Sequence, residues 1–320
     1  MSRQAHLIGS IGLENAETAM TKAAEILGPC CSRIPDGETG GRGYWIRWQQ
    51  STFDNCKDLQ EGMVQEALPG FKDSVRRPFY KIKQGVSPSD IELGDLGYAK
   101  EALSSYQIFS RLVTEEKISS DVRFQVSIPT PMALVCGFIM AEDQLNVEPA
   151  IESAMIKDVA QIQAEIPPDH LTIQWDVCYE VVGSDGGPKL PYDNNIPGTV
   201  ERLARLCGSI DDRVELVIHL CYGDPGHQHI VDPVDLGTSV EFANNICATS
   251  PRLINAVHMP VMRNRTDEAY FKPLKNLDIP NDTKLILGLV HFTDGVEGGK
   301  ARMATADKFV DGYDIATECG

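Results

Sequence analysis

The amino-acid sequence predicts an α/β protein of the (β/α)8 TIM barrel class. Apolar runs of strand length alternate with amphipathic stretches of helical length along the whole chain. There are eight such runs, as a barrel of strand-helix units requires. The competing fold is an open, doubly wound sheet, which usually carries a glycine-rich phosphate loop after its first strand. Here that loop is Gly9-Ser10-Ile11-Gly12, which lacks the phosphate-binding pattern.

The eight predicted strands end in polar or glycine residues, as barrel strands do at the mouth of the barrel. They cover residues 6–11, 32–35, 124–129, 171–177, 215–222, 254–259, 284–291 and 313–317. Residues 150–166 form the clearest predicted helix, because Ile151, Met155 and Ile162 fall on one stripe and Pro167 then ends it. Residues 199–207 repeat this pattern with Val200 and Leu203.

The predicted organisation is a single barrel domain over residues 1–320. An insertion at about residues 51–97, long, polar and proline-bearing, is expected in the second strand-helix unit as a lid or interface element. Residues 183–197 form a second long loop on the same rim. No helix follows the eighth strand before residue 320. We expect either a tail or another chain, such as a second copy in a homo-oligomer, to cover the groove this leaves.

Composition excludes several functional classes. Hydrophobic residues make up 42% of the 320 residues and charged residues 23%, as in ordinary globular proteins. The net charge of −17 argues against a general nucleic-acid binder and against docking on anionic lipid. Neither a membrane span nor a secretory signal is evident. Nine irregularly spaced cysteines, an odd number, fit reduced thiols, so we expect a cytoplasmic protein.

The most informative motif is His219-Leu220-Cys221, at the end of the fifth predicted strand. Residues two apart on a strand face the same side, so both side chains can point into the barrel mouth and bind one metal ion. An imidazole and a thiolate suit Zn²⁺. His258 and Cys319 lie at other strand ends and are the expected further ligands. The alternative is a hydrogen-bonded core histidine beside a small buried cysteine.

Acidic residues form a second candidate group. Asp36, Glu38 and Asp176 end the second and fourth strands, where they can bind an amine or guanidinium or act as acid or base. The alternative is that they are solvated or paired with nearby arginines. His227 and His229 follow the fifth strand and are predicted to lie in a solvated loop.

Taken together, these motifs resemble the catalytic C-terminal barrel of the cobalamin-independent methionine synthase superfamily. Five segments carry the resemblance, in the family's order and over nearly the whole chain. They are Ile8-Gly9-Ser10, Asp36-Gly37-Glu38 with Arg42 and Trp45, Ile173-Gln174-Trp175-Asp176, Ile218-His219-Leu220-Cys221-Tyr222, and Thr317-Glu318-Cys319-Gly320.

The resemblance implies a zinc ion that binds a substrate thiol as the thiolate, which then attacks an alkyl donor. It implies His219, Cys221 and Cys319 as ligands, with His258 where the family has a glutamate ligand. Ser10, Glu38 and Asp176 would hold the amino-acid part of a homocysteine-like thiol. The other expected site residues are Asp36 and Tyr222 for substrate binding, and Asp176, His291 and Asp294 for catalysis.

The sequence also departs from the family pattern. The second acid of the family's Asp-Glu-Pro motif is missing, since this chain reads Asp176-Val177-Cys178. His291 is out of register with the family's proton-donating histidine, and Asp294 lies nearer its place. These 320 residues include no counterpart of the family's folate-binding N-terminal barrel. The leading hypothesis is therefore zinc-dependent transfer of a methyl or alkyl group to a small thiol, with the thiol and the alkyl donor as partners.

Two alternatives stay open. One is a metal-free lyase or decarboxylase like the related uroporphyrinogen decarboxylase barrel, working through Asp36, Asp176 and Arg263. The other is a non-catalytic binding barrel, which the altered sixth and seventh strand ends permit.

Overall fold

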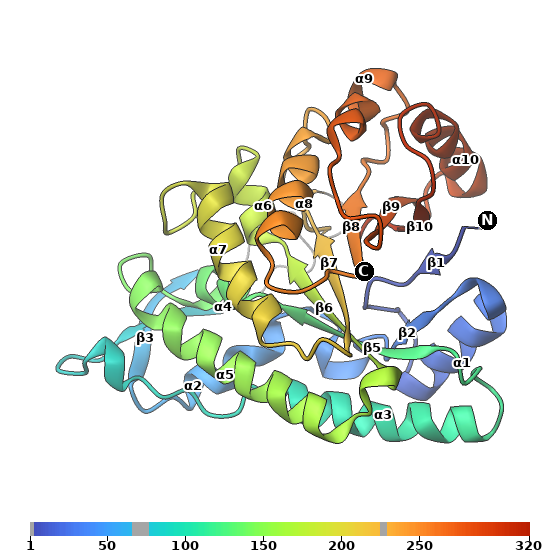
Figure 1. Cartoon of the computed structure of the whole chain (residues 1–320). Coiled ribbons are helices and arrows are strands. Elements are labelled where there is room, and N and C mark those ends of the chain that lie inside the picture. Colours follow the sequence, from blue (N-terminus) through green and yellow to red (C-terminus); the bar gives the residue numbers. More distant parts are fainter. Residues whose placement is uncertain (1–2, 66–76, 225–228) are drawn as a thin grey trace.

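A computed structural model describes residues 3–65, 77–224 and 229–320. Eight parallel strands form one sheet in the order β1-β10-β9-β8-β7-β6-β5-β2, and parallel bridges from Ala5 to Cys31 and from Ser10 to Gly37 join β1 to β2 (Figure 1). The strands are β1 (Ala5–His6), β2 (Arg33–Pro35), β5 (Arg123–Pro129), β6 (Leu171–Val177), β7 (Glu215–Leu220), β8 (Ala256–Pro260), β9 (Lys284–Val290) and β10 (Asp314–Thr317). The sheet thus closes on itself, and the predicted (β/α)8 barrel is confirmed.

Helices connect successive strands around the outside of the barrel. They are α1 (Ala16–Leu27), α3 (Tyr98–Thr114), α4 (Pro131–Phe138), α5 (Gln144–Glu165), α6 (Tyr179–Ser184), α7 (Asn195–Gly208), α8 (Gly237–Thr249), α9 (Glu268–Phe271) and α10 (Gly295–Ala306). The helices predicted at 150–166 and 199–207 correspond to α5 and α7. Helix α5 begins earlier than predicted and contains Pro149. Among the described residues, no helix is long and apolar enough to cross a membrane.

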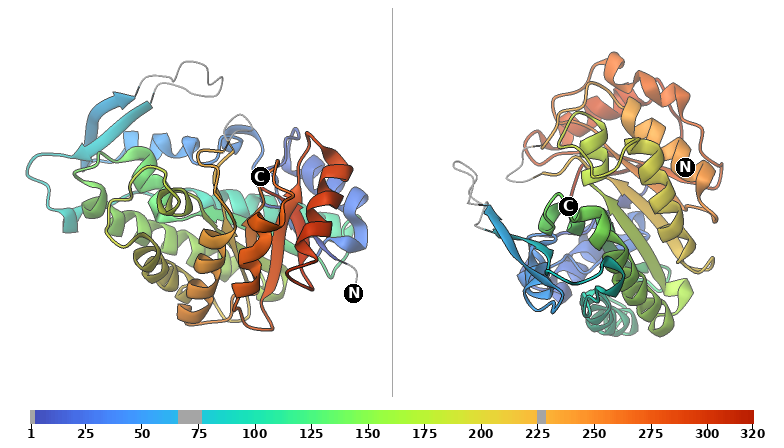
Figure 2. Two further views of the ribbon diagram at one scale, coloured as in Figure 1. Left: turned by 90° about the horizontal axis from the view of Figure 1, so that it is seen from above. Right: turned by 90° about the vertical axis from the view of Figure 1, so that its left-hand side faces the viewer.

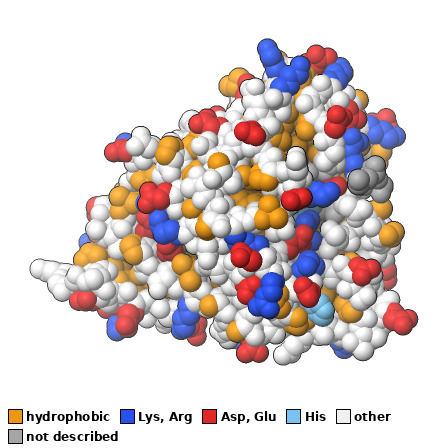
Figure 3. Space-filling model, viewed as in Figure 1, with side chains coloured by type: hydrophobic (Ala, Val, Ile, Leu, Met, Phe, Trp, Pro, Cys, Tyr) orange, Lys and Arg blue, Asp and Glu red, His pale blue; other side chains and the backbone are white. Residues whose placement is uncertain are grey.

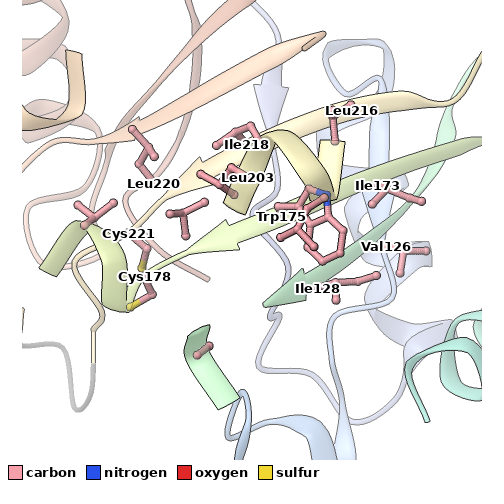
Figure 4. Close-up of a cluster of buried hydrophobic side chains, with 14 of the residues drawn as sticks. Val126, Ile128, Ile173, Trp175, Cys178, Leu203, Leu216, Ile218, Leu220 and Cys221 are labelled. Atoms are coloured by element: carbon pink, nitrogen blue, oxygen red, sulfur yellow. The ribbon is translucent and has the colours of Figure 1, made fainter. Parts of the chain in front are cut away.

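The strands bury two faces of different character. Leu216, Ile218 and Leu220 of β7 point outward with Trp175 of β6, toward Leu203 of α7 (Figure 4). This layer between sheet and helices is the main hydrophobic core. The alternate residues point into the barrel, where a separate small cluster is made by Ile8, Val217, Ala256, Ile286 and Ala316. The alternation along each strand therefore decides which residues can reach the barrel mouth.

Polar side chains fill much of the remaining barrel interior and hold the short strand β1. Gln125 Nε2 donates to the carbonyls of Leu7 and Ile8 at 2.9 and 3.0 Å. Gln174 Nε2 also donates to the Ile8 carbonyl, at 2.6 Å. These side chains satisfy backbone acceptors that a longer strand would have paired with its neighbour. They thereby fix the Gly9-Ser10 segment at the mouth.

A buried ion pair crosses the opposite end of the barrel. Arg33 of β2 donates to Glu215 of β7 through Nε at 2.8 Å and Nη2 at 2.6 Å. Thr172 Oγ1 donates to the same carboxylate at 2.7 Å. Burial alone would raise the pKa of Glu215, but the bonds from Arg33 outweigh it and the pKa is lowered. Glu215 is thus ionised and holds two non-adjacent strands together.

The segment between β2 and α3 contains α2 (Gln50–Asp54) and an antiparallel hairpin of β3 (Leu59–Gln65) and β4 (Arg77–Ile82). Both views in Figure 2 show the hairpin projecting from the barrel. Strand β4 is anchored because the Met140 backbone N–H donates to the Tyr80 backbone carbonyl at 2.8 Å and the Tyr80 side chain is buried. On the face seen in Figure 3, Lys and Arg side chains are interspersed with Asp and Glu.

Candidate functional site

The candidate site lies where β6, β7, β8 and β10 end. The sheet register places Asp176 beside His219, and His219 beside His258. Register partners in a parallel sheet point to the same face, and residues two apart on one strand do so as well. Asp176, His219, His258 and Cys221 therefore converge on the barrel mouth.

Three side chains form a group with metal-ligand geometry. Ligand atoms of His219, Cys221 and Cys319 all lie within 4.8 Å of one another. The two Sγ atoms are 3.3 Å apart, and the Gly223 backbone N–H donates to Cys221 Sγ at 3.2 Å. One imidazole and two thiols match the donors of zinc sites. The donor chemistry therefore fits a zinc ion.

The protonation of this group is set by burial and by its own members. The pKa of Cys319 is raised well above its ordinary value, first by the contact with Cys221 and then by burial. The pKa of Cys221 is also raised, chiefly by the neighbouring Cys178 thiol. Burial lowers the pKa of His219, so its ring is neutral and can be a ligand. Metal binding to this group must release thiol protons, since the thiolate is the ligand.

His258 lies outside this group, although the sequence predicted it as a ligand. Its Nε2 lies 3.0 Å from the Thr317 carbonyl, and its Nδ1 lies 2.8 Å from His219 Nδ1. Burial lowers the pKa of His258 to about 4, so the ring is neutral. A carbonyl only accepts, so Nε2 carries the proton and Nδ1 accepts from His219. His258 thereby leaves the Nε2 lone pair of His219 free for a metal.

A tight turn presents Glu38 beside the first strand. Asp36 accepts from the Glu38 backbone N–H at 2.9 Å, from Arg42 Nη2 at 2.6 Å and from Ser105 Oγ at 2.7 Å. Gly37 has a φ of 81° and leaves no room for a Cβ, which would lie 2.8 Å from that of Ala19. Glu38 itself has a φ of 48°, a conformation that is costly for a residue with a side chain. Asp36 therefore supports the turn, and Glu38 is the acid it presents.

Glu38 and Asp176 form a pair of poorly solvated carboxyl groups. Burial raises the pKa of Glu38 to about 7, even though Ser10 Oγ donates to it at 2.5 Å. Burial, and next the charge of Glu38, raise the pKa of Asp176 well above its ordinary value. Gln174 Nε2 donates to Asp176 at 2.8 Å. Two such groups favour a bound cation, which would restore their ionised forms.

Replacing Glu38 by glutamine is expected to raise the free energy of unfolding at pH 8 by about 1–3 kcal/mol, with no gain at pH 4. The folded pKa of about 7 lies above the ordinary 4.5, so the folded state binds more protons between these values. Wild-type stability therefore falls as the pH rises through this window, and the amide escapes that loss. Urea unfolding at both pH values measures the difference. The exposed Glu14→Gln is the control, and an equal shift at pH 4 and pH 8 would contradict the assignment.

Glu318, next to Cys319, gathers a further set of groups that the sequence did not predict as a site. Its carboxylate lies 2.6 Å from His229 Nε2 and 3.1 Å from His291 Nδ1. Bonds from these two histidines lower its pKa to about 2, against the effect of burial. Ligand atoms of Asp224, His229 and Glu318 lie within 4.8 Å of one another. His229 is thus mostly buried rather than in a solvated loop, while His227 lies outside the described residues.

Three predicted residues are engaged elsewhere. Tyr222 follows Cys221 and so faces the opposite side, where its hydroxyl donates to Asp185 at 2.7 Å. Asp294 accepts two bonds of 2.7 Å from the fully buried Arg302. His291 is buried, with Nε2 donating to the Val261 carbonyl at 2.8 Å. We therefore omit Tyr222 and Asp294 from the candidate site and keep His291 only as a partner of Glu318.

Comparison with known proteins adds little to this geometry. No protein-family model matches the chain, and no curated protein matches it. Among solved structures, the chain is similar to the apo form of the homocysteine methyltransferase MmuM from Escherichia coli. The identity is 12% and the TM-score 0.33, over 74% of this chain and 71% of that one. A similarity of this size carries no inference about function, so the function has to be argued from the site.

Proposed function

We propose that the protein is a zinc-dependent enzyme that transfers a methyl or alkyl group to a small thiol carrying an amino group, such as homocysteine. The observation that carries this proposal is the convergence of His219, Cys221 and Cys319 at the barrel mouth. Bound zinc would supply a Lewis acid that lowers the pKa of the acceptor thiol, so that the thiolate is available at neutral pH.

The protein's own residues would position the acceptor. Asp176 is buried beside His219, and Glu38 is half-buried and influences its pKa, so an ammonium group between the two acids would offset their mutual repulsion. Ser10, hydrogen-bonded to Glu38, would fix the orientation of that carboxylate. The acceptor sulfur would form the new S–C bond. The donor would keep the electron pair of the bond that breaks.

The resemblance to the methionine synthase superfamily supports the same assignment, because its motifs fall on these residues. The family's glutamate ligand has no counterpart here, since His258 turns toward His219 instead. We therefore propose that the enzyme alkylates thiols and that its acceptor is an aminothiol. We expect the enzyme to be cytoplasmic.

The test is a transfer assay with zinc-loaded protein. We expect S-methylation of L-homocysteine by methylcobalamin, detected by mass spectrometry, at a rate well above the protein-free reaction. Thiols without an amino group, such as 2-mercaptoethanol, should react more slowly. Glu38→Gln should remove this preference by raising the KM for homocysteine, while the KM for 2-mercaptoethanol stays unchanged.

Two results would contradict the proposal. One is a protein that binds zinc but alkylates no thiol with methylcobalamin, S-methylmethionine or methyl iodide as donor. The other is a carboxylate-dependent activity in zinc-free protein, which would favour the lyase or decarboxylase alternative.

A further inference from the structure

Cys178 lies beside the metal group, and the proposed function gives it no role. It directly follows β6, and its side chain is only 4% exposed. The register pairs Val177 with Leu220, so the next pair is Cys178 and Cys221. The Cys221 backbone N–H donates to the Val177 carbonyl at 3.0 Å, which extends the ladder to this point. Figure 4 shows the two cysteines near each other beyond the ends of these strands.

The thiol of Cys178 lies on the same side as the metal group, because it contacts the thiol of Cys221. Cys178 and Cys221 each lie one residue beyond their strands, β6 and β7, and two residues after Asp176 and His219. Asp176 and His219 are paired in the register and face the barrel mouth. Of all neighbouring groups, the Cys178 thiol has the largest effect on the pKa of the Cys221 thiol, which it raises.

We infer that Cys178 is the fourth ligand of the metal centre, which then has three thiolates and one imidazole. This inference rests on the proposed function, because it takes the His219-Cys221-Cys319 group to bind zinc. A tetrahedral zinc ion with three protein ligands lacks a fourth ligand. Three cysteines and one histidine are a common donor set for zinc. His258 cannot complete it, because both of its ring nitrogens are engaged.

Side-chain rotation alone can bring Cys178 into the group. The Cys178 thiol contacts the Cys221 thiol, but it does not belong to the group of ligand atoms that all lie within 4.8 Å of one another. A change of staggered rotamer about the Cα–Cβ bond moves a cysteine sulfur by about 3 Å without moving the backbone. A tetrahedral zinc site with Zn–S bonds of about 2.3 Å separates its sulfurs by about 3.8 Å. The Cys221 and Cys319 sulfurs, now 3.3 Å apart, would also have to separate.

Four protein ligands would close the site until an acceptor thiol displaces one of them. Loss of Cys178 would leave the His219-Cys221-Cys319 group intact, so Cys178 would be the ligand that makes room for the acceptor.

The test uses the full chain loaded with Co²⁺, whose thiolate charge-transfer absorption increases with the number of coordinated thiolates. We expect Cys178→Ser to keep about one metal ion per chain but to lose about one third of this absorption. X-ray absorption of the zinc protein should give three sulfurs in the wild type and two in the variant. Cys247→Ser, which changes a thiol on α8, is the matched control and should match the wild type. Cys178→Ala should repeat the loss, and circular dichroism confirms that both variants fold.

The outcomes separate this inference from the proposed function. A wild-type protein that binds metal through two sulfurs, with a spectrum that Cys178→Ser does not change, overturns the inference and leaves the proposed function standing. A wild-type protein that binds no metal overturns both.

Discussion

Replacing Cys221 by serine is expected to lower the zinc content from about one ion per chain to less than about one tenth. The Cys221 thiol lies between its partners, with its Sγ 3.3 Å from Cys319 Sγ, and Cys221 follows directly on β7, the strand of His219. A serine hydroxyl is a poor zinc ligand at neutral pH because it stays protonated. Cys221 is the thiol that contacts both Cys319 and Cys178, so without it the remaining donors are no longer held together around one metal ion.

Elemental mass spectrometry of freshly purified and zinc-reconstituted protein measures this loss. Cys247→Ser removes a thiol outside the group and should keep its zinc. The wild type should also unfold at a higher temperature with zinc than after chelation, while Cys221→Ser should show no such difference. A variant that retains zinc would contradict the ligand assignment. A wild type without zinc would shift attention to the carboxyl groups of Asp36, Glu38 and Asp176.

Replacing Glu215 by alanine is expected to lower the free energy of unfolding by about 3–5 kcal/mol. The substitution leaves the buried Arg33 guanidinium without its carboxylate, and it leaves the Thr172 hydroxyl without its acceptor. An uncompensated buried charge accounts for most of the loss, since the intact pair itself contributes little. For a chain of this length the midpoint of thermal unfolding should fall by roughly 5–8 °C.

Calorimetry and urea unfolding test this value. The control is Glu92→Ala, which removes an exposed ion pair with Lys57 and should change stability by less than about 1 kcal/mol. If both variants lost the same free energy of unfolding, the ion pair between Arg33 and Glu215 would stabilise the barrel no more than an exposed pair does.

The fold could be predicted because the hydrophobic pattern has one interpretation over most of the chain. The strand predicted at 171–177 coincides with β6, whose side chains are all buried. The strand predicted at 6–11 shrinks to two residues in β1. Its next carbonyls, those of Leu7 and Ile8, accept from the glutamine side chains of Gln125 and Gln174 instead of from a strand. Such long-range side-chain bonds leave no mark on local periodicity.

The candidate site could be predicted only where strand parity governs it. His219 and Cys221 are two apart and point together, whereas Tyr222 falls on the other parity and points away. Cys178 lies one residue beyond β6, where the chain turns into α6, so the strand pattern alone does not identify it as a site residue. The contact between His229 and Glu318 could not be predicted, because it joins a loop to a residue 89 positions away.

The position of Cys319, two residues after the last strand of the barrel, links metal binding to the order in which the chain is made. Cys221 and His219 emerge from the ribosome about 100 residues before Cys319, whose ladder then places β10 between β9 and β1. The three-ligand group cannot assemble until that final strand has inserted and the barrel is closed. Zinc uptake during synthesis or refolding would therefore follow closure of the barrel rather than nucleate it. The rate of zinc uptake would report when the first and last strands meet.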